Sequence, residues 1–141
     1  MLIRRLLSTL LLGLTLQAHA DDFAVITLNP NMKELRPNQV KLIYRGRVSH
    51  INGVAIRLLD LPRSSHYRED FYRQLLNKSP TQMSAIWARL SFSGKAIAPT
   101  ELSSEAPDEI LRWLKSNRNG IAYLPAKLLP EDAYVIYQLS D

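Results

Sequence analysis

The chain has no cysteine among its 141 residues and only three histidines. The lack of cysteine excludes disulfides, lipid attachment through a thioether and thiolate ligands for zinc. Beyond residue 20 only His50 and His66 remain, without H-x-H or H-E-x-x-H spacing. A G-x-S-x-G nucleophile elbow and the glycine-rich phosphate loops are also missing. We therefore expect no catalytic residues, no metal and no cofactor.

Only one long apolar run is present, and it lies at the N-terminus. Arg4 and Arg5 precede an apolar stretch over 6–16, and the small-x-small sequence Ala18-His19-Ala20 follows it. This order is typical of a cleavable signal peptide, and the run is too short to cross a bilayer core of about 30 Å as a helix. We expect residues 1–20 to be removed and a single domain over 21–141 to remain. Export without cysteine favours the bacterial periplasm.

The formal net charge is +5, of which Arg4 and Arg5 of the leader contribute two. In the rest of the chain, lysine and arginine are scattered among acids from Lys33 to Lys127. A nucleic-acid binder usually gathers its cations in a stripe, so we expect no nucleic-acid partner. A small anionic ligand remains open. No second apolar run of membrane length follows the leader, so we expect no membrane span in the mature form.

Strand and helix signals alternate along the mature chain. The predicted strands are 23–28, 54–59, 121–124 and 134–139, and the predicted helices begin at Pro37, at Ser64 or Ser65, at Pro80 and at Ser103-Ser104. This order favours an α/β fold in which helices flank a mostly parallel sheet, with 134–139 at one edge.

The junction before the second predicted helix carries the best candidate site. In an open α/β sheet, ligands gather at the carboxyl ends of strands, where helix N-termini present free amides. Ser64, Ser65, Arg63 and Arg68 cluster at this junction. A cation at the third helical position opposes the helix dipole, and a bound oxyanion would relieve that conflict. The alternative is that the two acids after Arg68 offset its charge and its side chain points to water.

One further pattern is spread over most of the chain, in the segments 23–29, 40–47, 79–83, 87–90, 92–95, Pro99 and 119–124. Together these segments resemble the substrate-binding proteins of phosphate ABC transporters, especially their short single-lobe relatives. The similarity covers nearly all of 23–139.

The resemblance implies one lobe of the type II periplasmic-binding-protein fold. Its two-lobe members close on phosphate with a serine-glycine-threonine at a helix N-terminus, preceded by arginine and aspartate. Alignment sets Ser65 on the serine but His66 and Tyr67 on the glycine and threonine, while Leu61 and Arg63 fall on the arginine and aspartate. Of the residues with which the two-lobe members hold phosphate, this alignment keeps only the serine.

Two functions follow from these observations. The first is an exported solute-binding module for phosphate or a related oxyanion, acting in phosphate transport or sensing. The alternative is a lobe that binds no ligand and serves as an envelope interaction or accessory protein beside a transporter. A single lobe offers one wall of a binding cleft, and a homodimer could supply the other.

Overall fold

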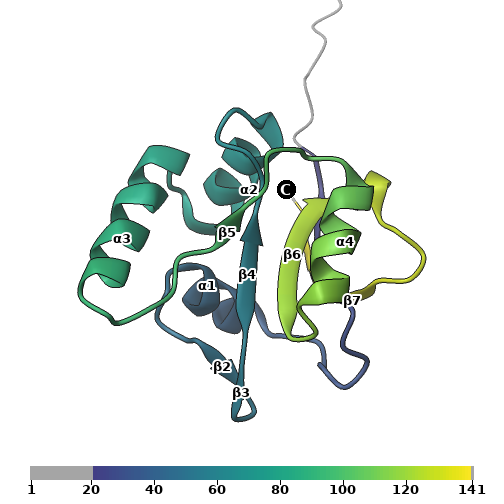
Figure 1. Ribbon diagram of the computed structural model, residues 1–141. Coiled ribbons are helices and arrows are strands. Elements are labelled where there is room, and N and C mark those ends of the chain that lie inside the picture. The colour runs from purple at the N-terminus through teal and green to yellow at the C-terminus, as the bar shows by residue number, and fades with distance from the viewer. Residues whose placement is uncertain (1–20, 141) are drawn as a thin grey trace, which may run out of the picture.

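The computed structural model describes residues 21–140; the predicted signal peptide, 1–20, lies outside the described residues. A five-stranded sheet with the order β5-β4-β6-β1-β7 forms its centre. A two-stranded hairpin, β2-β3, projects below it (Figure 1). The strands are β1 (Phe23–Thr27), β2 (His50–Ile51), β3 (Val54–Ala55), β4 (Arg57–Asp60), β5 (Thr100–Glu101), β6 (Gly120–Pro125) and β7 (Tyr134–Leu139).

The predicted α/β class is confirmed, and the sheet has two halves of different pairing. Strand β4 runs parallel to both β5 and β6, whereas β1 is antiparallel to both β6 and β7. The parallel pairing expected from the sequence thus holds in the half that contains β4. Strand β7 lies at an edge, as predicted. The predicted strand 54–59 is divided, because β3 belongs to the hairpin and only β4 enters the sheet.

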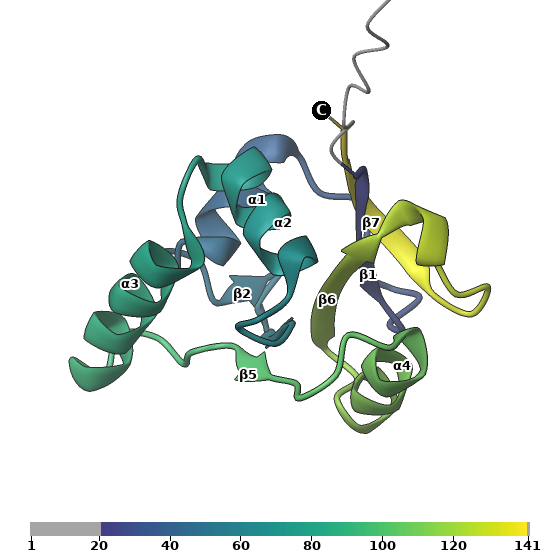
Figure 2. The ribbon, with the colours of Figure 1, turned by 90° about the horizontal axis from the view of Figure 1, so that it is seen from above.

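In the part of the chain that the structure describes, four α-helices surround the sheet: α1 (Pro37–Tyr44), α2 (His66–Leu76), α3 (Pro80–Phe92) and α4 (Pro107–Ser116). Seen from above, α1 and α2 cover one face, α4 covers the other, and α3 stands beyond the β4 side (Figure 2). Among residues 21–140, no helix is both long and apolar enough to span a bilayer.

Local signals explain where α1 and α3 begin. Pro37 occupies the first turn of α1, and Ser79 forms a capping box with Gln82 at the start of α3. The expected start at Ser103-Ser104 is wrong: α4 begins at Pro107. The Ser104 hydroxyl instead accepts a hydrogen bond from the Ala106 amide, in a turn before the helix.

Aromatic side chains fill the core between the sheet and α1 and α2. Phe71 of α2 stacks on Tyr123 of β6 with ring centroids 3.8 Å apart, and Tyr44 meets the Phe71 ring edge-on. Phe23, Tyr44, Phe71, Tyr72 and Tyr123 are all almost fully buried. A buried tyrosine hydroxyl usually finds a hydrogen-bond partner, and those of Tyr72 and Tyr123 point to one carboxylate at the site described next.

Candidate functional site

The carboxyl ends of two parallel strands place two acids side by side. In the register of β4 and β5, Asp60 lies opposite Glu101. The chain leaves β4 at Asp60, passes through Pro62 and enters α2 with Ser65 as its N-cap. The candidate junction therefore lies at the carboxyl edge of the parallel half, the position at which ligands gather in α/β sheets.

Arg68 turns inward to these two acids rather than outward to solvent. Its side chain is only 5 % exposed, and its Nη1 donates a 2.9 Å hydrogen bond to the Leu61 carbonyl oxygen. Nη2 lies 3.5 Å from Asp60 Oδ2, and Nη1 lies 3.4 Å from Glu101 Oε2. The conflict between this cation and the helix dipole is thus relieved by carboxylates of the chain itself. The alternative in which Arg68 points to water is wrong.

Asp60 is the centre of a buried polar network. Its carboxylate accepts hydrogen bonds from the Tyr72 hydroxyl at 2.6 Å, from the Tyr123 hydroxyl and from the Leu61 amide. Burial raises the pKa of Asp60, while Arg68 and the hydrogen bonds oppose that rise. Burial, reinforced by the negative charge of Asp60, also raises the pKa of both tyrosines well above the ordinary value. The two hydroxyls therefore stay protonated and act as donors.

A carboxylate contacts Ser65 at the N-terminus of α2, which we call the mouth of α2. Its hydroxyl accepts a 3.3 Å hydrogen bond from the Arg68 amide, as an N-cap does, and donates a 2.7 Å hydrogen bond to Glu105 Oε2. Glu105 lies in the connection between β5 and α4. A carboxylate from the chain thus lies beside the N-cap hydroxyl of α2.

A hollow of about 540 Å³ opens over this mouth, and its lining includes four serines. They are Ser64, Ser65, Ser103 and Ser104, with Glu105 and His66 beside them. Of the four predicted site residues, the structure brings Ser64 and Ser65 together in this hollow.

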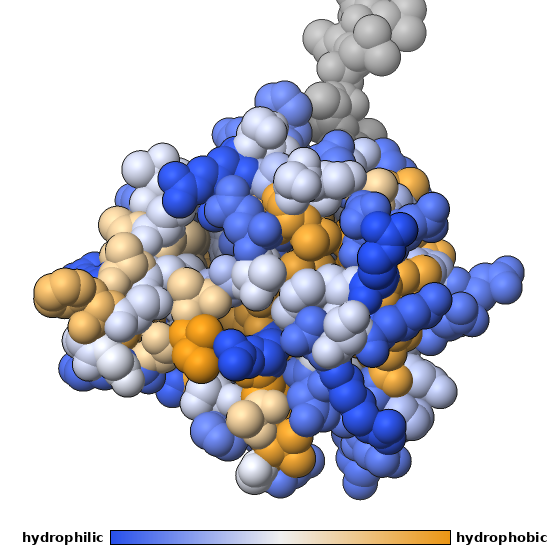
Figure 3. Space-filling model, viewed as in Figure 1, coloured by the Kyte–Doolittle hydropathy of each residue, from blue (hydrophilic) through white to orange (hydrophobic). Residues whose placement is uncertain are grey.

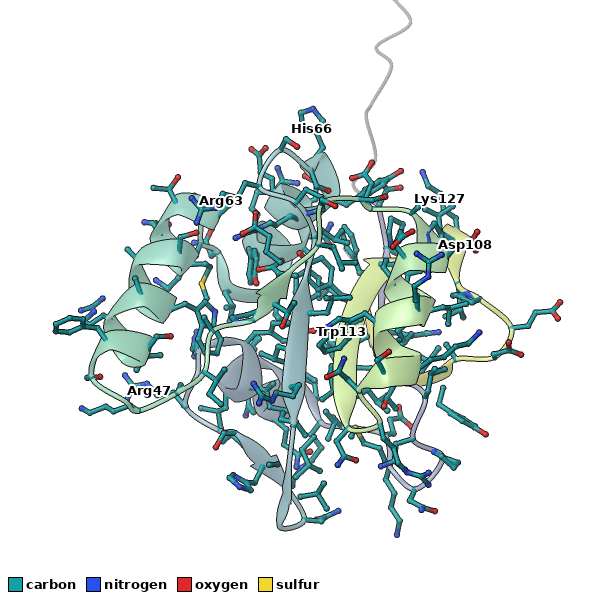
Figure 4. The ribbon with its side chains drawn as sticks, in the orientation of Figure 1. Arg47, Arg63, His66, Asp108, Trp113 and Lys127 are labelled. Atoms are coloured by element: carbon teal, nitrogen blue, oxygen red, sulfur yellow. The ribbon has the colours of Figure 1, made fainter. Side chains whose placement is uncertain are left out.

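The two predicted arginines lie outside the hollow lining. Arg68 lies in the buried network, and the exposed side chain of Arg63 has its Nε 3.4 Å from Glu101 Oε2. Figure 4 shows Arg63 and His66 at the carboxyl end of β4.

Sequence reasoning missed the residues that determine this geometry: Asp60, Tyr72, Glu101, Tyr123 and Glu105. One signal was available for Asp60, since an acid that ends an apolar strand shortly before a helix with an arginine in its first turn suggests an ion pair. Glu101 and Glu105 had none, because β5 has only two residues and its pairing depends on the tertiary fold. Within residues 21–140, no group of three or more potential ligands is arranged to hold a metal ion.

No protein family profile and no curated protein sequence matches the chain. Several solved structures do match it, and two of them are phosphate-transport proteins. One is described as a phosphate ABC transporter substrate-binding protein from Clostridium perfringens with bound phosphate, 18 % identical with a TM-score of 0.61. The other is an ABC-type phosphate transport receptor from Vibrio cholerae, 13 % identical with a TM-score of 0.61.

The matches cover 84 % of this chain but only 46 % and 47 % of the two solved chains, so the chain spans about half of their length. At these identities the likeness establishes the fold. The chain therefore has the fold of a single lobe of the phosphate-transporter substrate-binding proteins.

Proposed function

We propose that the protein is an exported, non-enzymatic binding module that holds phosphate or a related oxyanion at the mouth of α2, in phosphate transport or sensing. One observation carries the proposal: a serine-lined hollow lies over the Ser65-capped N-terminus of α2, at the carboxyl ends of β4 and β5. Serine hydroxyls and the first amides of a helix are suitable donors for an oxyanion. The solved structure from Clostridium perfringens is described with bound phosphate, which supports this class of ligand.

The two arginines have different roles in this proposal. Arg68 lies outside the lining of the hollow and pairs with Asp60 and Glu101, so it stabilises the junction between β4 and α2 rather than contacting a ligand. Arg63 is exposed, and its single ion pair is with Glu101. Because exposed ion pairs are weak, the Arg63 side chain can leave Glu101 and turn toward a ligand in the hollow.

Glu105 determines which anion is accepted. The Glu105 carboxylate repels an anionic ligand that lies beside Ser65, unless the ligand carries a proton that it can donate to Glu105. Hydrogen phosphate has such a proton, whereas sulfate has none near neutral pH. We therefore expect phosphate to bind more tightly than sulfate. With one wall in place of a closed cleft, we expect a Kd on the order of 1 mM for phosphate.

Isothermal titration at low ionic strength tests this proposal with phosphate and with sulfate. Ser65→Ala is expected to weaken phosphate binding, and Glu105→Gln is expected to remove the preference for phosphate over sulfate. Ser116→Ala, an exposed serine near the end of α4, is the matched control and should bind as the wild type does. The proposal is wrong if neither the wild type nor Glu105→Gln gives heat with millimolar phosphate.

Mass spectrometry of the protein from a periplasmic extract tests the export part of the proposal. We expect an N-terminus at Asp21. A protein mass that still includes residues 1–20 would contradict cleavage of a signal peptide.

A second function is favoured by a different observation. The Ser65 hydroxyl and the Arg68 guanidinium already have carboxylate partners, so the mouth of α2 is neutralised without a ligand. A lobe of this kind would serve as an envelope interaction or accessory protein, beside a transporter or as a homodimer. The titration separates the two functions, and sedimentation velocity with and without phosphate shows whether a second copy supplies the missing wall.

A further inference from the structure

A second hollow, of about 1110 Å³, lies between the end of α1 and α3. Five cations line it: Arg45, Arg47, Lys78, Arg89 and Lys95. We call this group the basic hollow. They come from three separate parts of the sequence, and the fold gathers them on one side of the molecule.

No carboxylate lines the basic hollow, and among residues 21–140 none of its five cations takes part in an ion pair. The reason lies in the sequence, because the stretches 35–59 and 71–100 contain no aspartate or glutamate. Cations near helix C-termini complement the helix dipole, which accounts for Arg45 and Arg89 individually. It does not account for five cations around one hollow without a counter-charge. Such an arrangement attracts an anionic partner.

Two exposed apolar residues flank Lys95 of the basic hollow in the sequence. Phe92, the last residue of α3, is 96 % exposed, and Ile97 in the following segment is 67 % exposed. Figure 3 shows scattered apolar residues exposed on the face seen in Figure 1. Phe92 makes almost no contact with its own chain, so its position has no packing explanation within the described domain.

We propose that the basic hollow, with Phe92 and Ile97, docks the protein on an anionic phospholipid bilayer. Phosphate headgroups supply the missing counter-charge, and exposed aromatic and aliphatic side chains enter the boundary between headgroups and acyl chains. Two separate protruding side chains suit a soft lipid surface. A protein partner would instead need a pocket of complementary shape for each of these side chains.

This surface is separate from the mouth of α2. Figure 4 shows Arg47 at the α3 side near the lower end of the sheet, whereas Arg63 and His66 lie at the opposite, carboxyl end. A bilayer held at the basic hollow therefore leaves the mouth of α2 accessible to a small anion. The proposal does not depend on phosphate binding at Ser65.

Vesicle co-sedimentation tests the proposal with protein from periplasmic extracts whose N-terminus is verified by mass spectrometry. The probes are vesicles of phosphatidylcholine mixed with phosphatidylglycerol and vesicles of phosphatidylcholine alone. We expect binding to the anionic vesicles only. Added salt should weaken it, because screening shortens the range of exposed charges.

Charge-neutralising variants locate the surface. Each Lys or Arg near an anionic membrane strengthens binding about fivefold, so Arg45→Gln/Arg47→Gln/Arg89→Gln should weaken it about a hundredfold. The matched control, Arg112→Gln/Lys115→Gln/Arg118→Gln, removes equal charge from exposed positions on and after α4 and should have a much smaller effect.

The apolar part is tested by Phe92→Ser/Ile97→Ser, which should weaken binding about tenfold while the circular dichroism spectrum stays that of the wild type. Ser65→Ala should bind vesicles as the wild type does.

Four outcomes would overturn the proposal. They are absence of vesicle binding, binding that does not require phosphatidylglycerol, equal losses in the two triple variants, and retention of a duplex DNA or an acidic polypeptide by a protein that ignores vesicles.

Discussion

Replacing Arg68 by methionine tests whether this arginine holds the fold together. The guanidinium donates to the Leu61 carbonyl and faces both Asp60 and Glu101, and its side chain is 5 % exposed. Methionine keeps much of the apolar volume of the side chain but removes the charge. Asp60 then stays buried with three hydrogen-bond donors and no cation.

The expected loss is large for a domain of this size. Removing one partner of a buried ion pair costs about 3–5 kcal/mol, against a total stability of about 5–15 kcal/mol for a typical domain. Arg63→Met removes the other cation beside Glu101, but its side chain is 76 % exposed. It should therefore cost no more than about 1 kcal/mol. A larger loss of unfolding free energy in Arg68→Met than in Arg63→Met would show that the buried arginine stabilises the fold.

Urea denaturation followed by circular dichroism gives the free energies of unfolding, provided that the slope of each transition is the same. In the double variant Arg68→Met/Asp60→Asn, the uncompensated charge is gone, so its loss should be smaller than the sum of the single losses by about 1–3 kcal/mol. The reasoning is refuted if Arg68→Met and Arg63→Met are equally stable. It is also refuted if the loss of unfolding free energy in the double variant equals the sum of the losses in Arg68→Met and Asp60→Asn.

Two further predictions concern stability. Burial raises the pKa of Asp60 above its ordinary value of 3.8, so the folded state holds the proton to higher pH than the unfolded chain does. The stability of the wild type relative to Asp60→Asn should be greatest below pH 3.8 and decline as pH rises through the folded-state pKa. Urea titrations over a pH series measure this decline, and a rise would contradict it. Gly46→Ala should cost about 2 kcal/mol or more, because φ is +74° and a Cβ would lie 2.5 Å from Leu90 Cδ1 and 3.0 Å from Trp87 Cζ3. Gly53→Ala, with φ of +80° and open space, should cost about 1 kcal/mol in thermal or urea unfolding, and equal losses would show that the close contact at Gly46 is unimportant.

The candidate site shows where sequence reasoning succeeds and where it fails. A capping serine and the carboxyl end of a strand are local features, so the mouth of α2 and Ser65 as its N-cap could be predicted. The conflict between Arg68 and the helix dipole was also visible, but its partners were not. Asp60 and Glu101 are 41 positions apart in the chain and meet only because β4 pairs with β5.

Charge distribution illustrates the same limit. Cations that look scattered along 33–127 come together around the basic hollow, because the ends of α1 and α3 are brought side by side.

The sequence by itself determined many local elements: where three of the four helices begin, that the first strand is buried, and the α/β order. These depend on residues within a few positions of one another, through capping, periodicity and turn chemistry. Only the tertiary structure decided that β1 pairs antiparallel with β6 and β7, that Glu105 takes the Ser65 hydroxyl, and that five cations share one hollow. These features depend on the packing of distant segments, whose register and orientation no local pattern specifies.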